Sequence, residues 1–207
     1  WHGSLIILKP LLSFFTMKYI YYIYLVCLSI LFFLLLVKLF KHSKLLGVLF
    51  TISSIVVNMF YTSFSDSLYY VFLISIIGSL ILINMYEKKN KNIDKLFLVI
   101  GMLTAYFDFL SCETVTLTIP LFIYVYLFIK DNRKVNYKLL INYALLWLFG
   151  YIFTFIVKWL FVFIYYHGSV SSKVFSPMKE RVYYERSNIF VMFYNNIVSA
   201  YKFIYPL

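Results

Sequence analysis

Acidic residues, glycine and cysteine are scarce in this chain of 207 residues. Eight Asp and Glu stand against nineteen Lys and Arg, and there are six glycines and two cysteines. The sequence contains no glycine-rich phosphate loop, no nucleophile elbow and no His-x-x-x-His spacing. These absences argue against nucleotide hydrolysis and predict no metal site. Cys27 lies in an apolar stretch and Cys112 in a predicted turn, so they form neither a ligand set nor a disulfide framework. The residues indicate no particular cofactor.

Charged side chains are also too few for a soluble protein of this size. The chain is 63% hydrophobic, 23% aromatic and only 13% charged, and so few charges cannot solvate the surface of a soluble fold. The net charge of +11 does not indicate nucleic acid, because the bases lie between apolar stretches and form no amphipathic basic stripe. We therefore predict an integral membrane protein whose partners are membrane lipids. Because the chain starts at Trp1 and stops at Leu207 within an apolar stretch, we expect a fragment of a longer protein.

The apolar stretches predict an all-α, polytopic transmembrane helix bundle with about six spans in residues 19–164. A helix needs about 20 apolar residues to cross roughly 30 Å of hydrocarbon. Four stretches are interpreted as single spans: Tyr19–Val37, Leu45–Tyr61, Leu68–Tyr86 and Leu139–Ile164.

The stretch from Leu96 to Ile129 is interpreted as two passes joined by a turn. It has 34 residues, which as one helix would cover about 51 Å and would place Lys95 and Lys130 on opposite faces of the membrane. Two passes of about 25 Å each keep both lysines on the same face. A short helical hairpin is therefore predicted, with its tip slightly below the far surface.

The distribution of lysine and arginine predicts the orientation of these passes. Eleven of these residues fall in the three breaks Lys38–Lys44, Glu87–Lys95 and Lys130–Lys138, and none falls in Thr62–Ser67 or Ser111–Thr116. Lysine and arginine in short loops mark the cytoplasmic side. We therefore place the basic loops in the cytoplasm and the acidic loops outside.

Both flanks of the six passes are expected on the outer side. Residues 1–18 form an outer interfacial segment, because Leu5–Phe15 is too short to span and carries Lys9 and Pro10. Residues 165–207 form an outer loop followed by Ile189–Tyr205, which has one apolar helical face. This last segment is either an amphipathic interfacial helix or the start of a seventh span. The whole chain, residues 1–207, is interpreted as a single transmembrane domain.

Three carboxylates on the predicted outer side are candidates for a catalytic acid or base. Asp66 lies at the mouth of the second and third spans, and Asp108 and Glu113 flank the hairpin tip. Placing a carboxylate within the membrane costs several kcal/mol unless the carboxylate is ion-paired or hydrated. Such a group therefore usually faces a protein cavity. The alternative for Asp66 is a helix N-cap or an ordinary loop residue.

Basic residues on the same side are candidates for binding a phosphate. Lys158 lies about 29 Å along a helix from Leu139, which places it near the outer boundary. It either snorkels to the interface beside Trp159 or points inward and binds phosphate as a compact charge. Arginine suits bidentate phosphate contacts. The candidates are Lys158, Arg181, Arg186, His2 and Lys9.

Several short motifs resemble a known layout. They are Trp1-His2-Gly3 with Lys9-Pro10-Leu11-Leu12, Tyr106-Phe107-Asp108-Phe109-Leu110, Pro120-Leu121, Gly150-Tyr151 and Lys158-Trp159. Together they look like a group of uncharacterised bacterial polytopic membrane proteins, which are similar in layout to the GT-C glycosyltransferases. The resemblance implies a bacterial plasma-membrane protein that transfers a sugar from a polyprenyl-phosphate carrier at the outer face. It further implies an outer acidic residue as base and basic residues on the lipid phosphate. The acidic motif in the first outer loop of such enzymes would precede Trp1.

Two other functions fit the same composition. A lipid or polysaccharide transporter would carry mobile helices with polar groups that reach the midplane of the membrane. A noncatalytic membrane scaffold would neutralise Asp108 and Glu113 through local hydrogen bonds, with no cavity between the hairpin tip and Lys158. The residues identify neither the donor nor the acceptor, and they do not indicate an oligomeric state.

Overall fold

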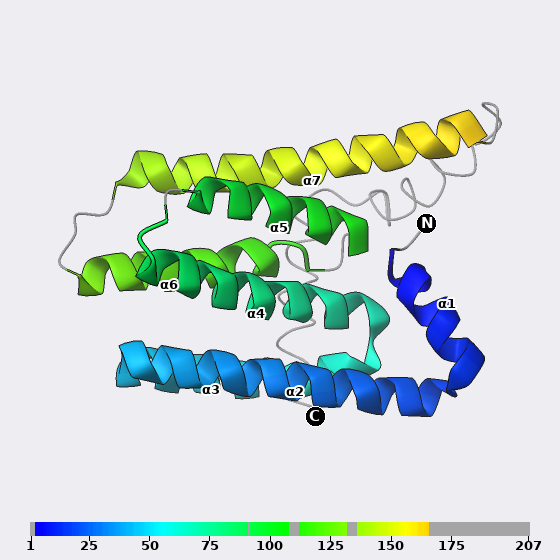
Figure 1. The fold of residues 1–207 in the computed structure, drawn as a ribbon, viewed down its shortest axis with the longest axis horizontal. Coiled ribbons are helices and arrows are strands. Elements are labelled where there is room, and N and C mark those ends of the chain that lie inside the picture. Colours follow the sequence, from blue (N-terminus) through cyan, green and yellow to red (C-terminus); the bar gives the residue numbers. More distant parts are fainter. Residues whose placement is uncertain (1–2, 91, 108–111, 132–135, 166–207) are drawn as a thin grey trace, which may run out of the picture. The chain divides into compact units, whose positions relative to one another are not determined.

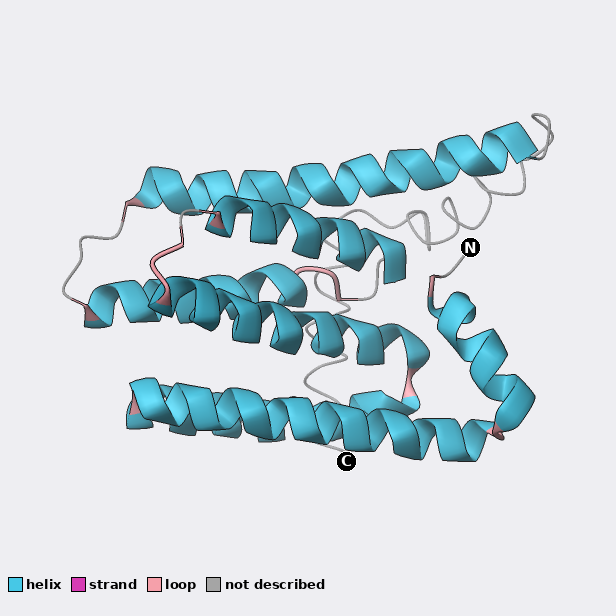
Figure 2. Cartoon of the chain, in the orientation of Figure 1, coloured by secondary structure: helices cyan, strands magenta, loops and turns pink. Residues whose placement is uncertain are grey.

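The computed structural model describes residues 3–90, 92–107, 112–131 and 136–165. These residues form helices joined by short turns, and no strand occurs among them (Figures 1 and 2). The elements are α1 (Ser4–Phe14), α2 (Met17–His42), α3 (Lys44–Val56), the 3-10 helix η1 (Met59–Phe64), α4 (Asp66–Glu87), α5 (Ile93–Phe107), α6 (Val115–Lys130) and α7 (Tyr137–Tyr165). The all-α prediction is thus confirmed for this part of the chain. His2, Asp108, Arg181, Arg186 and Ile189–Tyr205 lie outside the described residues.

The chain divides into two compact units, Trp1–Lys158 and Trp159–Leu207. The first unit holds α1 to α6 and most of α7. Of the second unit, the described part is the last turns of α7, where Leu160, Phe161, Phe163 and Ile164 are exposed.

Three helices are long and apolar enough to cross a membrane. They cover Met17–His42, Leu68–Glu87 and Tyr137–Phe161. The helices α3, α5 and α6 have 13, 15 and 16 residues and would cover only about 20 to 24 Å. Their composition is apolar, but their length falls short of the usual span. The structure therefore supports an integral membrane protein with three candidate spanning helices.

The second predicted span, Leu45–Tyr61, is broken in the structure. Its α-helix ends at Val56, and Asn58 adopts a left-handed conformation with φ 51° before η1 begins. Asparagine visits this conformation more readily than most residues, because its short polar side chain can bond locally. The helix thus ends five residues earlier than predicted, because the prediction rested on apolar length and gave no weight to a single asparagine.

The stretch between Leu96 and Ile129 forms two helices, α5 and α6, rather than one continuous helix. They run side by side and pack against each other and against α4. α4 is the central helix, because 61% of its most apolar stretch is buried, against 33% for that of α2 and 17% for that of α7. Its buried Ser75 and Ser79 donate to the carbonyls of Val71 and Ser75, so α4 itself satisfies both hydroxyls.

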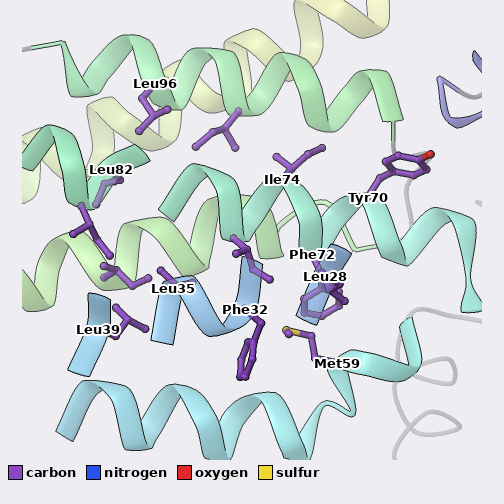
Figure 3. Packing of buried hydrophobic residues seen from close by; sticks show 14 of the residues in the cluster. Leu28, Phe32, Leu35, Leu39, Met59, Tyr70, Phe72, Ile74, Leu82 and Leu96 are labelled. Atoms are coloured by element: carbon purple, nitrogen blue, oxygen red, sulfur yellow. The ribbon is translucent and has the colours of Figure 1, made fainter. Parts of the chain in front are cut away.

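The core of the first unit lies between α4 and its neighbours. In Figure 3 Leu28 of α2 lies beside Phe72 of α4, whereas Ile74 lies on the opposite side of α4, toward α5. At one end the Tyr24 ring stacks on Tyr69 at 4.1 Å, and its hydroxyl lies 3.0 Å from that of Tyr70. These contacts between large side chains hold α2 against α4.

The backbones of α5 and α7 meet at two glycines. A Cβ added to Gly101 would lie 2.0 Å from the carbonyl oxygen of Trp147, and one added to Gly150 would lie 2.4 Å from that of Leu98. Small residues let membrane helices approach closely. Dispersion contacts then hold the helices together, because surrounding lipid provides no hydrophobic driving force for their association. The two glycines therefore fix the place where α5 and α7 cross.

Candidate functional site

Lys158 binds the C-terminal end of α5. Its Nζ donates to the carbonyl oxygens of Ala105 at 2.7 Å and of Tyr106 at 2.8 Å. The same Nζ lies 5.3 Å from the centre of the Tyr106 ring. The last carbonyls of a helix lack partners within the helix and carry partial negative charge, so a lysine there is favourable. Of the two hypotheses for Lys158, these contacts agree with the inward orientation.

The beginning of the described chain reaches the same point. The backbone N–H of Gly3 donates to the Tyr106 carbonyl oxygen at 3.2 Å. On the other side of α5, the Phe107 ring stacks on Tyr70 of α4 at 4.8 Å. The end of α5 is thus contacted by Gly3 just before α1, by α4 and by α7. A contact between Lys158 and a phosphate stays a prediction.

Glu113 is half-buried in the turn before α6. Its backbone carbonyl accepts the N–H of Thr116 at 3.2 Å and the hydroxyl of Thr116 at 2.8 Å. The carboxylate makes no hydrogen bond or ion pair with any residue in the described ranges, where the one ion pair joins His42 and Glu87. Within the described ranges, Glu113 therefore shows no local cap of the kind expected of a scaffold.

Thr116 links three helices through its buried hydroxyl, which the sequence analysis did not single out. Its Oγ1 accepts the indole N–H of Trp147 on α7 at 3.1 Å. The Thr104 hydroxyl on α5 lies 2.8 Å from Thr116 Oγ1 and 2.7 Å from the Ile100 carbonyl, and its one hydrogen serves either oxygen. Together with the bond to Glu113, this network ties the turn that carries Glu113 to α5 and α7.

Replacing Thr116 with valine is expected to lower the free energy of unfolding by about 1 to 2 kcal/mol, because the Trp147 N–H loses its acceptor in a buried site. The measurement is unfolding of the detergent-solubilised chain by titration with a denaturing detergent. Thr118→Val is the matched control, since Thr118 is exposed and, among the described residues, its hydroxyl reaches the Val115 carbonyl alone, at 3.4 Å. Equal losses in both variants would contradict the role of the network.

The other candidate residues do not join this group among the described contacts. Asp66 is the first residue of α4, and the N-cap position belongs to Ser65, whose side chain makes no capping hydrogen bond. The N-cap hypothesis for Asp66 is therefore wrong, and the structure describes only its backbone. Lys9 is exposed on α1, whereas Ser4 and Leu8 of that helix are buried. Their roles as base and as phosphate ligand stay predictions.

An apolar cavity of about 510 Å³ lies between α3, η1, α4 and α6. The α3 residues on its wall run from Leu46 to Ser54, Val57 follows just after that helix, and those of α6 run from Val115 to Ile123. Val115 and Thr118 are two and five residues beyond Glu113. Sequence periodicity did not reveal this cavity, because it arises where the short helix α3 ends and η1 turns away.

The site thus combines a carboxylate that has no partner among the described residues, a lysine that holds the end of α5 and an apolar cavity that reaches the start of α6. Neither Glu113 nor Lys158 lines that cavity. Among the described residues there is no group of three or more His, Cys, Asp or Glu that could hold a metal ion. Comparisons with protein-family models, with curated proteins and with solved structures found no match for the chain.

Proposed function

We propose that this chain is a GT-C-like membrane glycosyltransferase that takes a sugar from a polyprenyl-phosphate carrier at the outer face. In this proposal α2 to α7 make six passes, the basic loops lie in the cytoplasm, and the turn with Glu113 opens to the outside. The observation that carries the proposal is the apolar cavity between α3 and α6, which leads toward that turn. A polyprenyl chain is apolar, and its phosphate would emerge beside Glu113.

The proposed reaction needs a base and a stabilised leaving group. As the acceptor oxygen bonds to the anomeric carbon of the sugar, its proton passes to the Glu113 carboxylate or to Asp108. The bond from that carbon to the phosphate oxygen breaks, and its electron pair leaves with the polyprenyl phosphate. Cationic groups stabilise the charge on that phosphate, and Arg181, Arg186 and His2 are the proposed ligands. The contacts of Lys158 support a positioning role, because it holds the backbone that leads to Asp108.

The proposal is tested by following radiolabelled sugar as it leaves a polyprenyl-phosphate carrier in membranes that contain the full chain. We expect wild-type membranes to release sugar and Ser53→Trp membranes to release it at least about tenfold more slowly, since Ser53 lines the cavity and an indole would fill it. Ile52→Trp is the matched control, because Ile52 is exposed on the same helix and does not line the cavity.

Each alternative function has its own outcome in this experiment. Movement of intact carrier between the leaflets without sugar release would overturn the transferase proposal and favour a transporter. A noncatalytic scaffold would be favoured if neither sugar release nor carrier movement occurs and if added carrier does not bind in the cavity.

A further inference from the structure

A second cavity, of about 520 Å³, lies at the other end of the first unit. It is formed where α2, α4 and α6 end and where α5 and α7 begin, at the left of Figure 1. Small-molecule sites commonly measure about 300 to 1,000 Å³. Because α2 and α4 are candidate spanning helices that end here, the cavity lies where a membrane would carry its lipid headgroups.

Two carboxylates line the cavity, and each is oriented by one partner. Glu87 Oε1 lies 2.9 Å from His42 Nε2. Asp131 Oδ2 accepts the hydroxyl of Tyr86 at 2.6 Å. Within the described ranges, the second oxygen of each carboxylate has no partner. Two such oxygens are acceptors for the N–H groups of a primary ammonium ion.

Aromatic rings form another part of the wall. The rings of Tyr86 and Tyr143 meet that of Tyr124 edge-on, with centroids 6.0 Å and 5.4 Å apart. Aromatic faces attract cations, and the attraction is stronger when the cation is shielded from water. The rings and the two carboxylates therefore favour a positively charged ligand group on this side of the cavity.

Lys89 brings the opposite charge to the same cavity. It adopts a left-handed conformation with φ 51° just after α4 ends, and it lines the cavity. No carboxylate of the described residues lies within ion-pair distance of it, since the one such pair is His42 with Glu87. The Lys130 ammonium, by contrast, already donates to the His42 carbonyl. Lys89 is thus the lining lysine that can bind an anionic group.

A ligand that matches both the acidic, aromatic side of the cavity and Lys89 carries a primary amine and a phosphate. The two carboxylates would repel a simple phosphate, and a simple amine would leave Lys89 without a counter-charge. We propose that this cavity binds the headgroup of a phosphoethanolamine-type phospholipid. The ammonium group binds Glu87 and Asp131, the phosphate binds Lys89, and the acyl chains remain in the bilayer. This site is independent of the proposed transferase activity and lies at the opposite end of the unit.

The first test is lipid retention by the purified full chain, measured by native mass spectrometry in detergent with one added phospholipid at a time. We expect phosphatidylethanolamine to bind at least about tenfold more tightly than phosphatidylglycerol, which lacks the amine. It should also bind more tightly than phosphatidylcholine, because a quaternary ammonium cannot donate hydrogen bonds to the carboxylates. Equal binding of all three lipids would overturn the proposal without the need for any variant.

Two variants locate the lipid. Lys89→Gln is expected to weaken binding of phosphatidylethanolamine about tenfold, whereas Lys88→Gln, which changes a neighbour that does not line the cavity, leaves it unchanged. Equal losses in both would show a general charge effect and would contradict the site. Soluble phosphoethanolamine is added as a competitor. Displacement of the lipid by the soluble compound at equal concentration would overturn the assignment to a lipid.

Discussion

Replacing Glu113 with glutamine is expected to slow sugar release from the polyprenyl-phosphate carrier by about 10²- to 10⁴-fold, which is the usual contribution of a general base. Glutamine has nearly the same shape but cannot accept the proton of the acceptor hydroxyl. Because the Glu113 carboxylate has no hydrogen bond or ion pair with a described residue, its replacement should not disturb the fold. The measurement separates kcat from KM, and the loss should fall on kcat.

The control for this experiment is the neighbouring residue. Cys112 is exposed in the same turn, so Cys112→Ser is expected to retain wild-type release. Glu113→Asp keeps a carboxylate and should recover part of the activity. If Glu113→Gln releases sugar at the wild-type rate while Asp108→Asn does not, Asp108 is the base and Glu113 has no part in the chemistry.

Replacing Gly101 with alanine is expected to lower the free energy of unfolding by about 3 kcal/mol, at the upper end of the range for overpacked cores. The added methyl would lie 2.0 Å from the Trp147 carbonyl oxygen. That oxygen belongs to the backbone of α7 and cannot rotate away, so the two helices must separate. The separation would also strain the hydrogen bond from Trp147 to Thr116. Unfolding by denaturing detergent, followed by circular dichroism, provides the measurement.

Gly78→Ala is the matched control, because it adds the same methyl to a buried helix. There the nearest atom is Ile100 Cδ1, at 2.8 Å, which is the free end of a flexible side chain. A change of rotamer at Ile100 can make room, so we expect a change of less than about 1 kcal/mol. Equal losses at Gly78 and Gly101 would mean that α5 and α7 do not depend on their close approach.

The elements that could be predicted from the sequence are those that depend on composition over many residues. Long apolar stretches predicted the helices around Tyr19–Val37, Leu68–Tyr86 and Leu139–Ile164 because one signal repeats over five turns or more. The turn between α5 and α6 followed from the membrane thickness and the charges at Lys95 and Lys130. Where a boundary depended on a single residue, as at Asn58, the signal was too weak.

The candidate site was predictable only as a set of residue types. Glu113 and Lys158 were singled out because charge is rare in apolar stretches, but the partners of Lys158 are backbone carbonyls, which every residue carries and which no sequence pattern marks. Thr116 was missed for a related reason. A threonine in an apolar helix is unremarkable until the fold brings Thr104 and Trp147 against it.

The short length of α3 has a consequence for the surrounding bilayer. In the six-pass arrangement that we propose, its 13 residues cover about 20 Å of a hydrocarbon layer that is about 30 Å thick. Its exposed Leu45, Leu49, Ile52 and Ile55 would contact acyl chains. Such a mismatch is relieved by local thinning of the membrane. Lipid headgroups beside α3 would then lie deeper than elsewhere around the protein, and a carrier lipid would reach the cavity with less of its chain drawn out of the bilayer.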